Sequence, residues 1–252
     1  MSPRPLVIAH RGASGVAPEH TAAAYHQAIA DGADGFECDV RLTRDRVLVC
    51  LHDRTVDRTS NGRGVVSQLT LAQLQAFDFG SWKGEPAAVL TLEELLGIAV
   101  DTGRPLVLAI ETKHPTRYAG EVERRLTELL RRFGLDAAGS HGVTARVMSF
   151  SPVALRTASR HAPGLATVAL MTRLPKGTGS RPLFGGARIA GPSLAAVKAD
   201  PSYVARAHAR GDQVYVWTVD APDDLGLLAD LGVDAIITNR PDVAVRELAA
   251  GS

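Results

Sequence analysis

The stretch Phe36–Asp53 has the sequence F-E-C-D-V-R-L-T-R-D-R-V-L-V-C-L-H-D. Two extended apolar runs, Phe36–Leu42 and Val47–Leu51, are separated by the four polar residues Thr43–Arg46. Four residues are too few for a crossover between parallel strands, which needs a dozen or more. The two runs must therefore pair as an antiparallel hairpin or not pair at all, and we predict the hairpin.

This hairpin would bring two acids and a histidine together. With Asp45 and Arg46 in the turn, Asp39 faces His52, whereas a register shifted by one residue would turn His52 to the opposite face. Glu37 and Asp39 are two residues apart, so both carboxylates project from one face. An E-x-D pair is more often a solvated strand face, but the neighbours here are apolar. Buried acids are rare unless they are paired or bind a cation, so we predict a metal site beside an acid/base group.

Outward from the hairpin, strands and helices alternate. Leaving out the return arm, the forward strands are predicted at 6–9, 36–42, 106–110, 146–150, 165–171, 188–194, 213–218 and 235–238. Helices are predicted at 22–30, 71–76, 91–101, 118–133, 152–160, 201–209, 223–231 and 242–249. Such alternation predicts an α/β fold with a parallel sheet, and eight units favour a TIM (β/α)8 barrel over a doubly wound open sheet. No G-x-G-x-x-G follows the first strand, which argues against a nucleotide-binding open sheet.

Length and composition predict a single domain. The 252 residues are 45% hydrophobic and 22% charged, which suits one barrel domain over 1–252. The polar stretch 54–89 follows the hairpin and is predicted to be a small inserted subdomain, because a structureless loop of that length is uncommon in a compact domain. A net charge of +1 argues against a general nucleic-acid or membrane binder. Cys38 and Cys50 are offset in the predicted hairpin, which does not favour a disulfide. No signal peptide or membrane span is visible, so we expect a cytoplasmic protein.

Polar residues recur where the predicted strands end, which is where chemistry sits in such a barrel. They are His10, Arg11, Glu37, Asp39, Glu111, Lys113, Ser149, Trp217 and Asn239. Each has an ordinary explanation when taken alone: His10 as a helix cap or core histidine, Glu111 with Lys113 as an ion pair, Trp217 as core. Their coincidence at one rim favours a functional site.

These groups suit phosphoryl transfer. Three carboxylates make a hard oxygen site for Ca²⁺ or Mg²⁺, whereas zinc is less favoured without thiolates. Such a cation polarises a phosphoryl oxygen. Arg11 and Lys113 would hold a phosphate, and His10 and His52 would divide the acid and base roles.

The sequence resembles the glycerophosphodiester phosphodiesterase family along most of its length. The similar motifs are H-R-G-A-S-G-V-A-P-E-H-T at 10–21, E-C-D-V and V-L-V-C-L-H-D within 37–53, E-T-K at 111–113, V-Y-V-W-T-V-D at 214–220 and D-A-I-I-T-N-R-P at 234–241. The resemblance implies a TIM barrel like that of the phosphatidylinositol phospholipases C, with an insertion after the hairpin.

The resemblance also implies roles for individual residues. Glu37, Asp39 and Glu111 would be the metal ligands, His10 and His52 the general acid/base pair, and Arg11, Lys113 and Trp217 the substrate contacts. Glu19, which the chain keeps from the family's P-E-N-T motif, is expected to support or join the metal site. His20 departs from the Asn of that motif. Asp220 stands where the family commonly has Asn, and Asn239 where it commonly has Asp.

The implied activity is the divalent-cation-dependent hydrolysis of glycerophosphodiesters to sn-glycerol 3-phosphate and an alcohol, within glycerol and lipid metabolism. One alternative is phospholipase D-type cleavage of lysophospholipids or sphingomyelin, for which Phe77, Phe79 and Trp82 would supply an apolar lip. A second alternative is a non-catalytic barrel that binds a phosphate ligand. It is disfavoured because no expected catalytic position is lost. The head group, the preferred ion, the oligomeric state and the effect of the three departures stay open.

Overall fold

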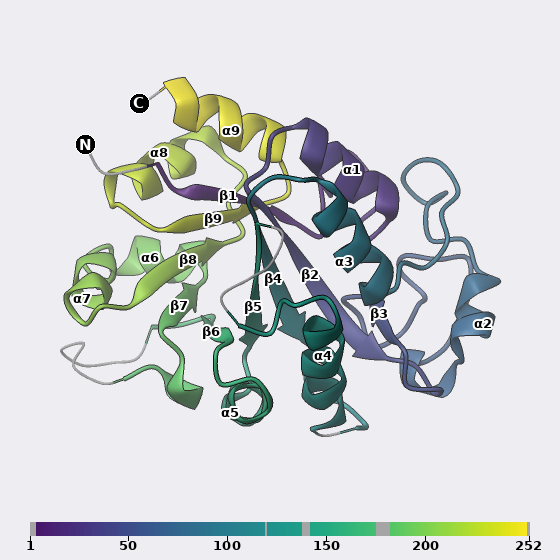
Figure 1. Cartoon of the computed structure of the whole chain (residues 1–252). Coiled ribbons are helices and arrows are strands. Elements are labelled where there is room, and N and C mark those ends of the chain that lie inside the picture. The colour runs from purple at the N-terminus through teal and green to yellow at the C-terminus, as the bar shows by residue number, and fades with distance from the viewer. Residues whose placement is uncertain (1–3, 119, 138–141, 175–181, 251–252) are drawn as a thin grey trace.

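A closed barrel of parallel strands forms the body of the protein. The structure, a computed structural model, describes residues 4–118, 120–137, 142–174 and 182–250. In this part of the chain one sheet has the strand order β1-β9-β8-β7-β6-β5-β4-β2-β3, and β1 also pairs with β2. This last pairing closes the barrel (Figure 1). The predicted TIM barrel is therefore confirmed, and the open-sheet alternative is wrong.

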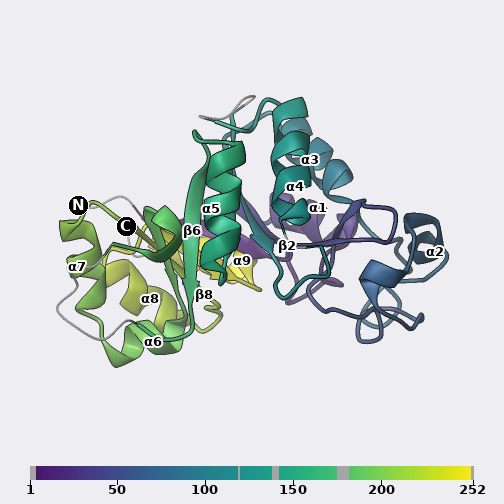
Figure 2. The ribbon, with the colours of Figure 1, turned by 90° about the horizontal axis from the view of Figure 1, so that it is seen from below.

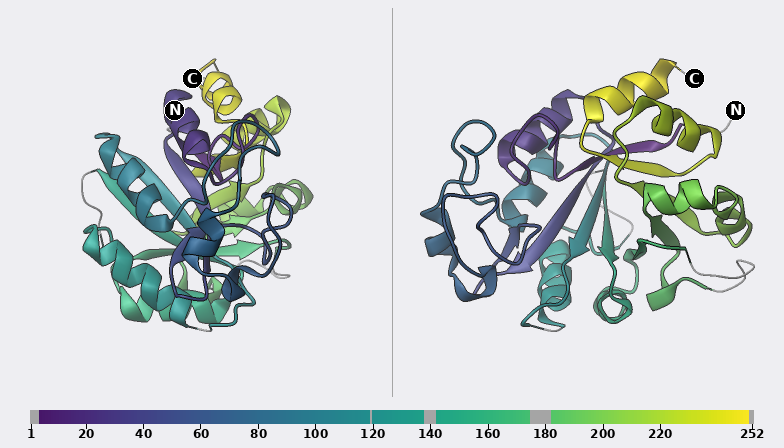
Figure 3. Two further views of the ribbon diagram at one scale, coloured as in Figure 1. Left: turned by 90° about the vertical axis from the view of Figure 1, so that its right-hand side faces the viewer. Right: turned by 180° about the vertical axis from the view of Figure 1, so that it is seen from behind.

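The elements follow one another as strand and helix. The barrel strands are β1 (Leu6–His10), β2 (Gly35–Leu42), β4 (Leu106–Thr112), β5 (Val143–Ser149), β6 (Ala166–Met171), β7 (Ile189–Pro192), β8 (Gln213–Trp217) and β9 (Ala235–Thr238), and β3 (Leu48–Cys50) is the return arm of the hairpin. The helices are α1 (Ala22–Ala30), α2 (Leu71–Gln75), α3 (Leu92–Asp101), α4 (Glu121–Arg132), α5 (Pro152–His161), α6 (Leu194–Ala199), α7 (Tyr203–Ala209), α8 (Pro222–Asp230) and α9 (Pro241–Ala250), with short 3₁₀ turns η1 (Val66–Gln68) and η2 (Phe184–Gly186). Apart from α2, the helices lie around the outside of the barrel (Figures 1 and 3).

Successive residues of each strand point to opposite faces, which separates two apolar layers. The outward residues pack under the helices in one large cluster that includes Phe36, Leu108 and Ile110. The inward residues form a second, smaller cluster of Ile8, Ala109, Met148, Val168, Leu170, Ile189, Tyr215, Ala235 and Ile237. Two residues further along several strands, this inward series changes from apolar to polar. That change places the polar side chains at one end of the barrel.

Most of the predicted helices begin within one residue of the predicted start. The side chains of Thr21, Thr91 and Ser151 each accept a hydrogen bond from a backbone N–H in the first turn of the following helix. One helix was not predicted. The expected strand at 188–194 ends at Pro192, and α6 begins at Leu194 with Ser193 as its cap. The Ser-Leu-Ala-Ala-Val-Lys sequence is a helix start that the apolar run obscured.

The hairpin is antiparallel, as predicted, but its register differs by one residue. Val40 pairs with Cys50, so Asp39 does not face His52. The turn holds three residues instead of two, because Thr43 N–H donates to the Val47 carbonyl at 3.0 Å and Arg46 adopts a left-handed φ of 67°. Cys38 and Cys50 are both buried and free, as expected.

The segment between β3 and α3 projects to one side of the barrel, where α2 lies (Figures 1 and 2). Its apolar cluster consists of Val49, Leu51, Val56, Val66, Leu74, Phe79 and Val89, so it includes residues of the hairpin arm. Of its aromatic side chains, Phe79 is buried whereas Trp82 is 43% exposed. Among the described residues, we find no helix with the length and apolar character needed to span a membrane.

Candidate active site

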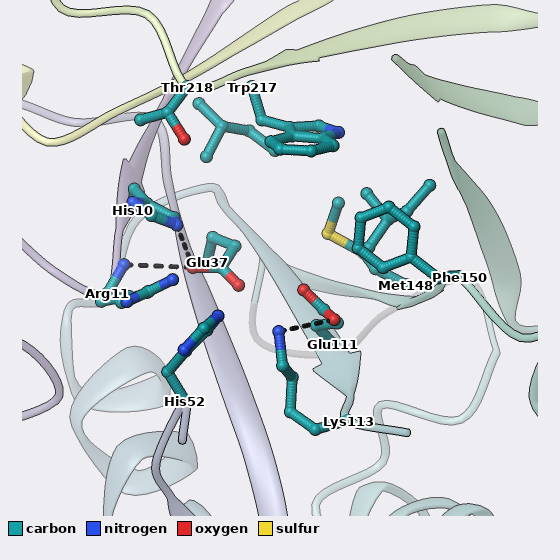
Figure 4. A pocket seen from close by; sticks show the side chains of 12 residues that line it. His10, Arg11, Glu37, His52, Glu111, Lys113, Met148, Phe150, Trp217 and Thr218 are labelled. Atoms are coloured by element: carbon teal, nitrogen blue, oxygen red, sulfur yellow. Dashed lines mark hydrogen bonds and ion pairs between the residues drawn. The ribbon is translucent and has the colours of Figure 1, made fainter. Parts of the chain in front are cut away.

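A cavity of about 210 Å³ opens at the carboxyl end of the barrel strands. It is lined by His10, Arg11, Glu37, His52, Glu111, Lys113, Met148, Phe150, Leu170, Trp217, Thr218 and Ile237. Charged and imidazole side chains occupy one side of this pocket, and aromatic and apolar side chains occupy the other (Figure 4). The pocket can therefore hold a molecule with a charged part and a carbon-rich part.

Three carboxylates meet at the charged side of the pocket. The register of β2 with β4 places Asp39 beside Glu111, and that of β1 with β2 places Glu37 beside His10. One carboxylate oxygen from each of Glu37, Asp39 and Glu111 lies within 4.8 Å of the others. The structure thus brings together the three residues that the sequence indicated as metal ligands.

Asp39 is the most enclosed of the three acids, at 1% exposure. One of its oxygens, Oδ2, lies 3.0 Å from Arg11 Nε and 3.0 Å from His20 Nε2, and the other, Oδ1, lies 3.2 Å from Lys113 Nζ. Burial alone would raise the pKa of Asp39, but His20, Lys113 and Arg11 outweigh it and hold that pKa well below its usual range.

The two glutamates have the opposite shift. Burial, together with the negative charge of Asp39, raises the pKa of Glu37 well above its ordinary value. The same two causes raise the pKa of Glu111 to about 7, although Lys113 Nζ lies 2.8 Å from Glu111 Oε1. At both glutamates, burial and the neighbouring negative charge therefore outweigh the nearby cations.

The donor set fits a hard divalent cation. Asp39 Oδ1 is buried and accepts no hydrogen bond, because the nearby Lys113 ammonium is placed for charge attraction without hydrogen-bond geometry. A buried carboxylate oxygen that accepts no hydrogen bond is available to a further ligand. Together with two further carboxylates it offers the all-oxygen surroundings that Ca²⁺ and Mg²⁺ prefer.

Two imidazole rings border the pocket with Glu37 between them (Figure 4). His10 Nδ1 lies 2.7 Å from Asn239 Oδ1, and its Nε2 lies 3.9 Å from Glu37 Oε2. His52 Nδ1 lies 2.7 Å from Asp53 Oδ1. Burial, then the charge of Arg11, lowers the pKa of His10 to about 4, and burial also lowers the pKa of His52.

His52 reaches the pocket although the hairpin register differs from the predicted one. The strand pairing of β3 ends at Cys50, so the alternation of faces does not extend to His52. Instead, the Arg41 guanidinium donates two hydrogen bonds to the His52 carbonyl oxygen, at 2.9 and 2.8 Å. The turn after the strand, held by these bonds, positions the ring.

Glu19 does not join the three acids. Its carboxylate accepts a hydrogen bond from Arg11 at 2.9 Å and two from Arg58, at 2.7 and 2.8 Å. Burial opposes ionisation, but Arg58 and Arg11 lower the pKa of Glu19 to about 2. Glu19 therefore supports the site through Arg11, the residue that contacts Asp39.

Two of the other strand-end residues lie outside the pocket lining. Ser149 is fully buried and its hydroxyl donates to the Thr112 carbonyl, whereas Asn239 contacts His10. Trp217 lines the pocket as predicted, and its indole N–H donates to the Gly191 carbonyl at 2.7 Å.

The sequence did not indicate Phe150, which packs edge-to-face against Trp217 with ring centroids 5.6 Å apart. Nor did it indicate the contact of His20 with Asp39. The position of His20 inside the P-E-H-T motif was the only signal that could have pointed to it.

Comparison with known proteins agrees with this geometry. The model of the glycerophosphoryl diester phosphodiesterase family matches residues 10–243. The chain is 47% identical over 247 residues to a probable glycerophosphodiester phosphodiesterase 1 of Mycobacterium tuberculosis, covering 94% of this chain and 90% of that one. It is 33% identical over 254 residues to a glycerophosphodiester phosphodiesterase of Bacillus subtilis, covering 95% and 85%.

A solved structure is similar over nearly its whole length. It is a phosphodiesterase of Oleispira antarctica in complex with the product sn-glycerol-3-phosphate, with a TM-score of 0.87, 27% identity, and coverage of 98% of this chain and 97% of that one. The match of the family model over most of the chain, together with relatives above 30% identity, shows that the chain belongs to the glycerophosphoryl diester phosphodiesterase family and is an enzyme with glycerophosphodiester phosphodiesterase activity.

Proposed function

We propose that the enzyme hydrolyses glycerophosphodiesters to sn-glycerol 3-phosphate and an alcohol, with a divalent cation, Ca²⁺ or Mg²⁺, held by Glu37, Asp39 and Glu111. The convergence of these three carboxylates within 4.8 Å, beside a pocket that Glu37, Glu111 and two histidines line, carries the proposal. The sn-glycerol-3-phosphate bound to the similar Oleispira antarctica enzyme supports the choice of product.

The bound cation would supply Lewis-acid polarisation of a phosphoryl oxygen and lower the pKa of a nearby hydroxyl. Arg11 and Lys113 would contact the phosphate with their cationic groups, which line the pocket and now pair with Asp39. Trp217 and Phe150 would contact the carbon-bearing part of the substrate on the opposite side.

The two histidines would divide the proton transfers. A glycerophosphodiester carries its own nucleophile, the glycerol hydroxyl next to the phosphate, and an intramolecular attack avoids much of the entropic barrier. His10 would take the hydroxyl proton while that oxygen forms a bond to phosphorus, and His52 would protonate the alcohol as its P–O bond breaks. Water would then open the cyclic phosphate with the two histidines exchanging roles, which yields sn-glycerol 3-phosphate. No covalent bond to the enzyme is required.

Phospholipase D-type cleavage of lysophospholipids is the second candidate. It needs an apolar surface for an acyl chain, and the observation that favours testing it is the 43% exposure of Phe150 at the pocket. Sphingomyelin would be cleaved at the same rim. The other alternative, a non-catalytic barrel that binds a phosphate ligand, is disfavoured because the chain belongs to a family of enzymes.

The proposal is tested by following the release of glycerol 3-phosphate from a panel of glycerophosphodiesters that includes the choline and ethanolamine diesters. We expect activity that EDTA abolishes and that added Ca²⁺ or Mg²⁺ restores. The isosteric Asp39→Asn enzyme should bind the cation much more weakly in a titration calorimeter, because the site loses a charged ligand. Undiminished turnover in EDTA would refute the metal assignment, and preferential cleavage of lysophospholipids would favour the second candidate.

The internal attack has a separate test. A diester that lacks the glycerol hydroxyl next to the phosphate should be a poor substrate, although it can still bind the cationic side of the pocket. Equal turnover of the deoxy and parent diesters would rule out the cyclic intermediate and leave the metal site untouched.

A further inference from the structure

Asn239 contacts His10 at Nδ1, and Asp220 in turn holds Asn239. We propose that Asp220 and Asn239 are positioning residues that fix the tautomer of His10 and leave its Nε2 free to accept a proton. This inference rests on the role proposed above for His10 as the proton acceptor. Neither residue lines the pocket, so they act through the imidazole.

Asp220 sets the orientation of the Asn239 side chain. It follows β8, and Asp220 Oδ1 accepts hydrogen bonds from the Thr238 hydroxyl at 2.9 Å and from the backbone N–H of Asn239 at 2.8 Å. Its other oxygen, Oδ2, accepts from Asn239 Nδ2 at 2.7 Å. An ionised carboxylate can only accept, so the NH₂ end of the Asn239 amide must face Asp220. The carbonyl end is thereby turned toward His10.

The amide orientation decides which ring nitrogen of His10 carries the proton. Asn239 Oδ1 lies 2.7 Å from His10 Nδ1, and the Ser14 hydroxyl lies 2.8 Å from that oxygen and 2.7 Å from the His10 carbonyl oxygen. A carbonyl oxygen can only accept, so Nδ1 must be the donor. A neutral imidazole has one N–H, which leaves a lone pair on Nε2. If the amide were reversed, its carbonyl oxygen would face Asp220 Oδ2, and two acceptor oxygens would meet with no hydrogen between them.

The free nitrogen lies on the pocket side of the ring. His10 Nε2 is 3.9 Å from Glu37 Oε2, among the residues that line the charged side of the pocket. The contact between His10 and Asn239 joins residues 229 positions apart, from the first and the last strand of the barrel. The parallel pairing of β1 with β9 is therefore what brings the acceptor oxygen to the ring.

The Asp220–Asn239 pair offers a reciprocal exchange as a test. In Asn239→Asp two carboxylates would meet where the 2.7 Å hydrogen bond now lies. We therefore expect kcat to fall by roughly 10- to 100-fold, a smaller loss than removal of a general base would cause. Adding Asp220→Asn should restore most of that loss. The new amide at 220 can donate to the new carboxylate at 239, and its carbonyl can still accept from Thr238.

A spectroscopic readout separates tautomer control from simple support of the fold. Long-range ¹H–¹⁵N spectra of the metal-free protein, at a pH where the ring is neutral, report which nitrogen of His10 is protonated. His10→Gln identifies the signal. We expect the Nδ1–H form in the wild type, and a shift toward the Nε2–H form in Asn239→Leu. Cation binding and KM should change little in Asn239→Leu, because neither Glu37 nor Asp39 contacts Asn239 directly in the structure.

Asp224→Asn is the matched control, because Asp224 lies on α8 and pairs with Lys198 at 2.7 Å. It should keep the wild-type kcat and the wild-type His10 spectrum. An Nε2–H signal in the wild type, or a wild-type kcat in both Asn239→Leu and Asn239→Asp, would overturn the inference. If His10→Gln kept the wild-type kcat, the proposed catalytic role of His10 would itself be wrong. This outcome distinguishes a failure of the proposed function from a failure of the positioning inference.

Discussion

At the scale of single residues, formal charge explains how the pocket could receive a phosphodiester. Glu37, Asp39 and Glu111 exceed Arg11 and Lys113 by one negative charge. A divalent cation would reverse that sign and leave one net positive charge. This net positive charge is opposite to the single negative charge of a phosphodiester. Attraction between opposite charges is stronger in a low-dielectric pocket.

The two histidines can be tested one at a time. We expect His10→Ala and His52→Ala each to lower kcat by about 10²- to 10⁴-fold, because each removes one proton transfer. Cation affinity, measured by titration calorimetry, should stay near that of the wild type. His26→Ala is the control, since His26 is exposed on α1. A near-wild-type kcat in either His10→Ala or His52→Ala would end the assignment of the pair.

At the scale of elements, α3 joins the inserted segment to the barrel. Thr91 caps α3 with a reciprocal capping box, in which the Glu94 carboxylate accepts a hydrogen bond from the Thr91 N–H. Thr91 also bridges to Val49 in the return arm of the hairpin. One residue therefore ties the helix start to the strand that leads to His52.

Loss of the α3 cap should lower stability measurably. We expect Thr91→Ala to reduce the free energy of unfolding by about 1 kcal/mol in urea denaturation, because a buried helix start loses its acceptor. Thr70→Ala is the comparison, since Thr70 forms the same capping box on the five-residue helix α2. Its effect should be smaller, because α2 is short and contributes only Leu74 as a buried residue. Equal effects of the two variants would contradict the importance given to α3.

At the scale of the whole molecule, the proposed metal site joins neighbouring barrel strands. Glu37 and Asp39 come from β2 and Glu111 from β4, and His10 comes from β1, which closes the barrel against β2. Mutual repulsion among the three acids opposes this closure when no cation is bound. Cation binding should therefore stabilise the folded protein as a whole.

This coupling predicts a cation-dependent melting temperature. With free Ca²⁺ or Mg²⁺ at about 100 times its Kd, linkage adds about 2.7 kcal/mol, which corresponds to a rise in Tm of roughly 5 to 10 °C for a chain of this size. Differential scanning calorimetry with and without EDTA measures it. In Asp39→Asn the rise should disappear at the same cation concentration. An equal rise in both proteins would place the stabilising cation elsewhere.

Local sequence determined the alternation of strands and helices, most of the helix caps and the positions of the acids at strand ends. Each of these follows from short-range periodicity or from a side chain bonding to its own turn. Because the carboxyl ends of parallel strands share one rim, Glu37, Asp39, Glu111, His10 and Lys113 could be assigned to one site before any coordinates were known.

The tertiary structure alone decided the contacts that orient these groups. The three-residue turn shifted the hairpin register, yet Arg41 still holds His52 at the pocket. His20 contacts Asp39, and Asn239 reaches His10 from the end of the neighbouring strand β9. A strand pattern gives the face of a residue but not its rotamer, its hydrogen-bond partner or the path of the turn. Those depend on packing between segments far apart in the chain, which no local window of sequence contains.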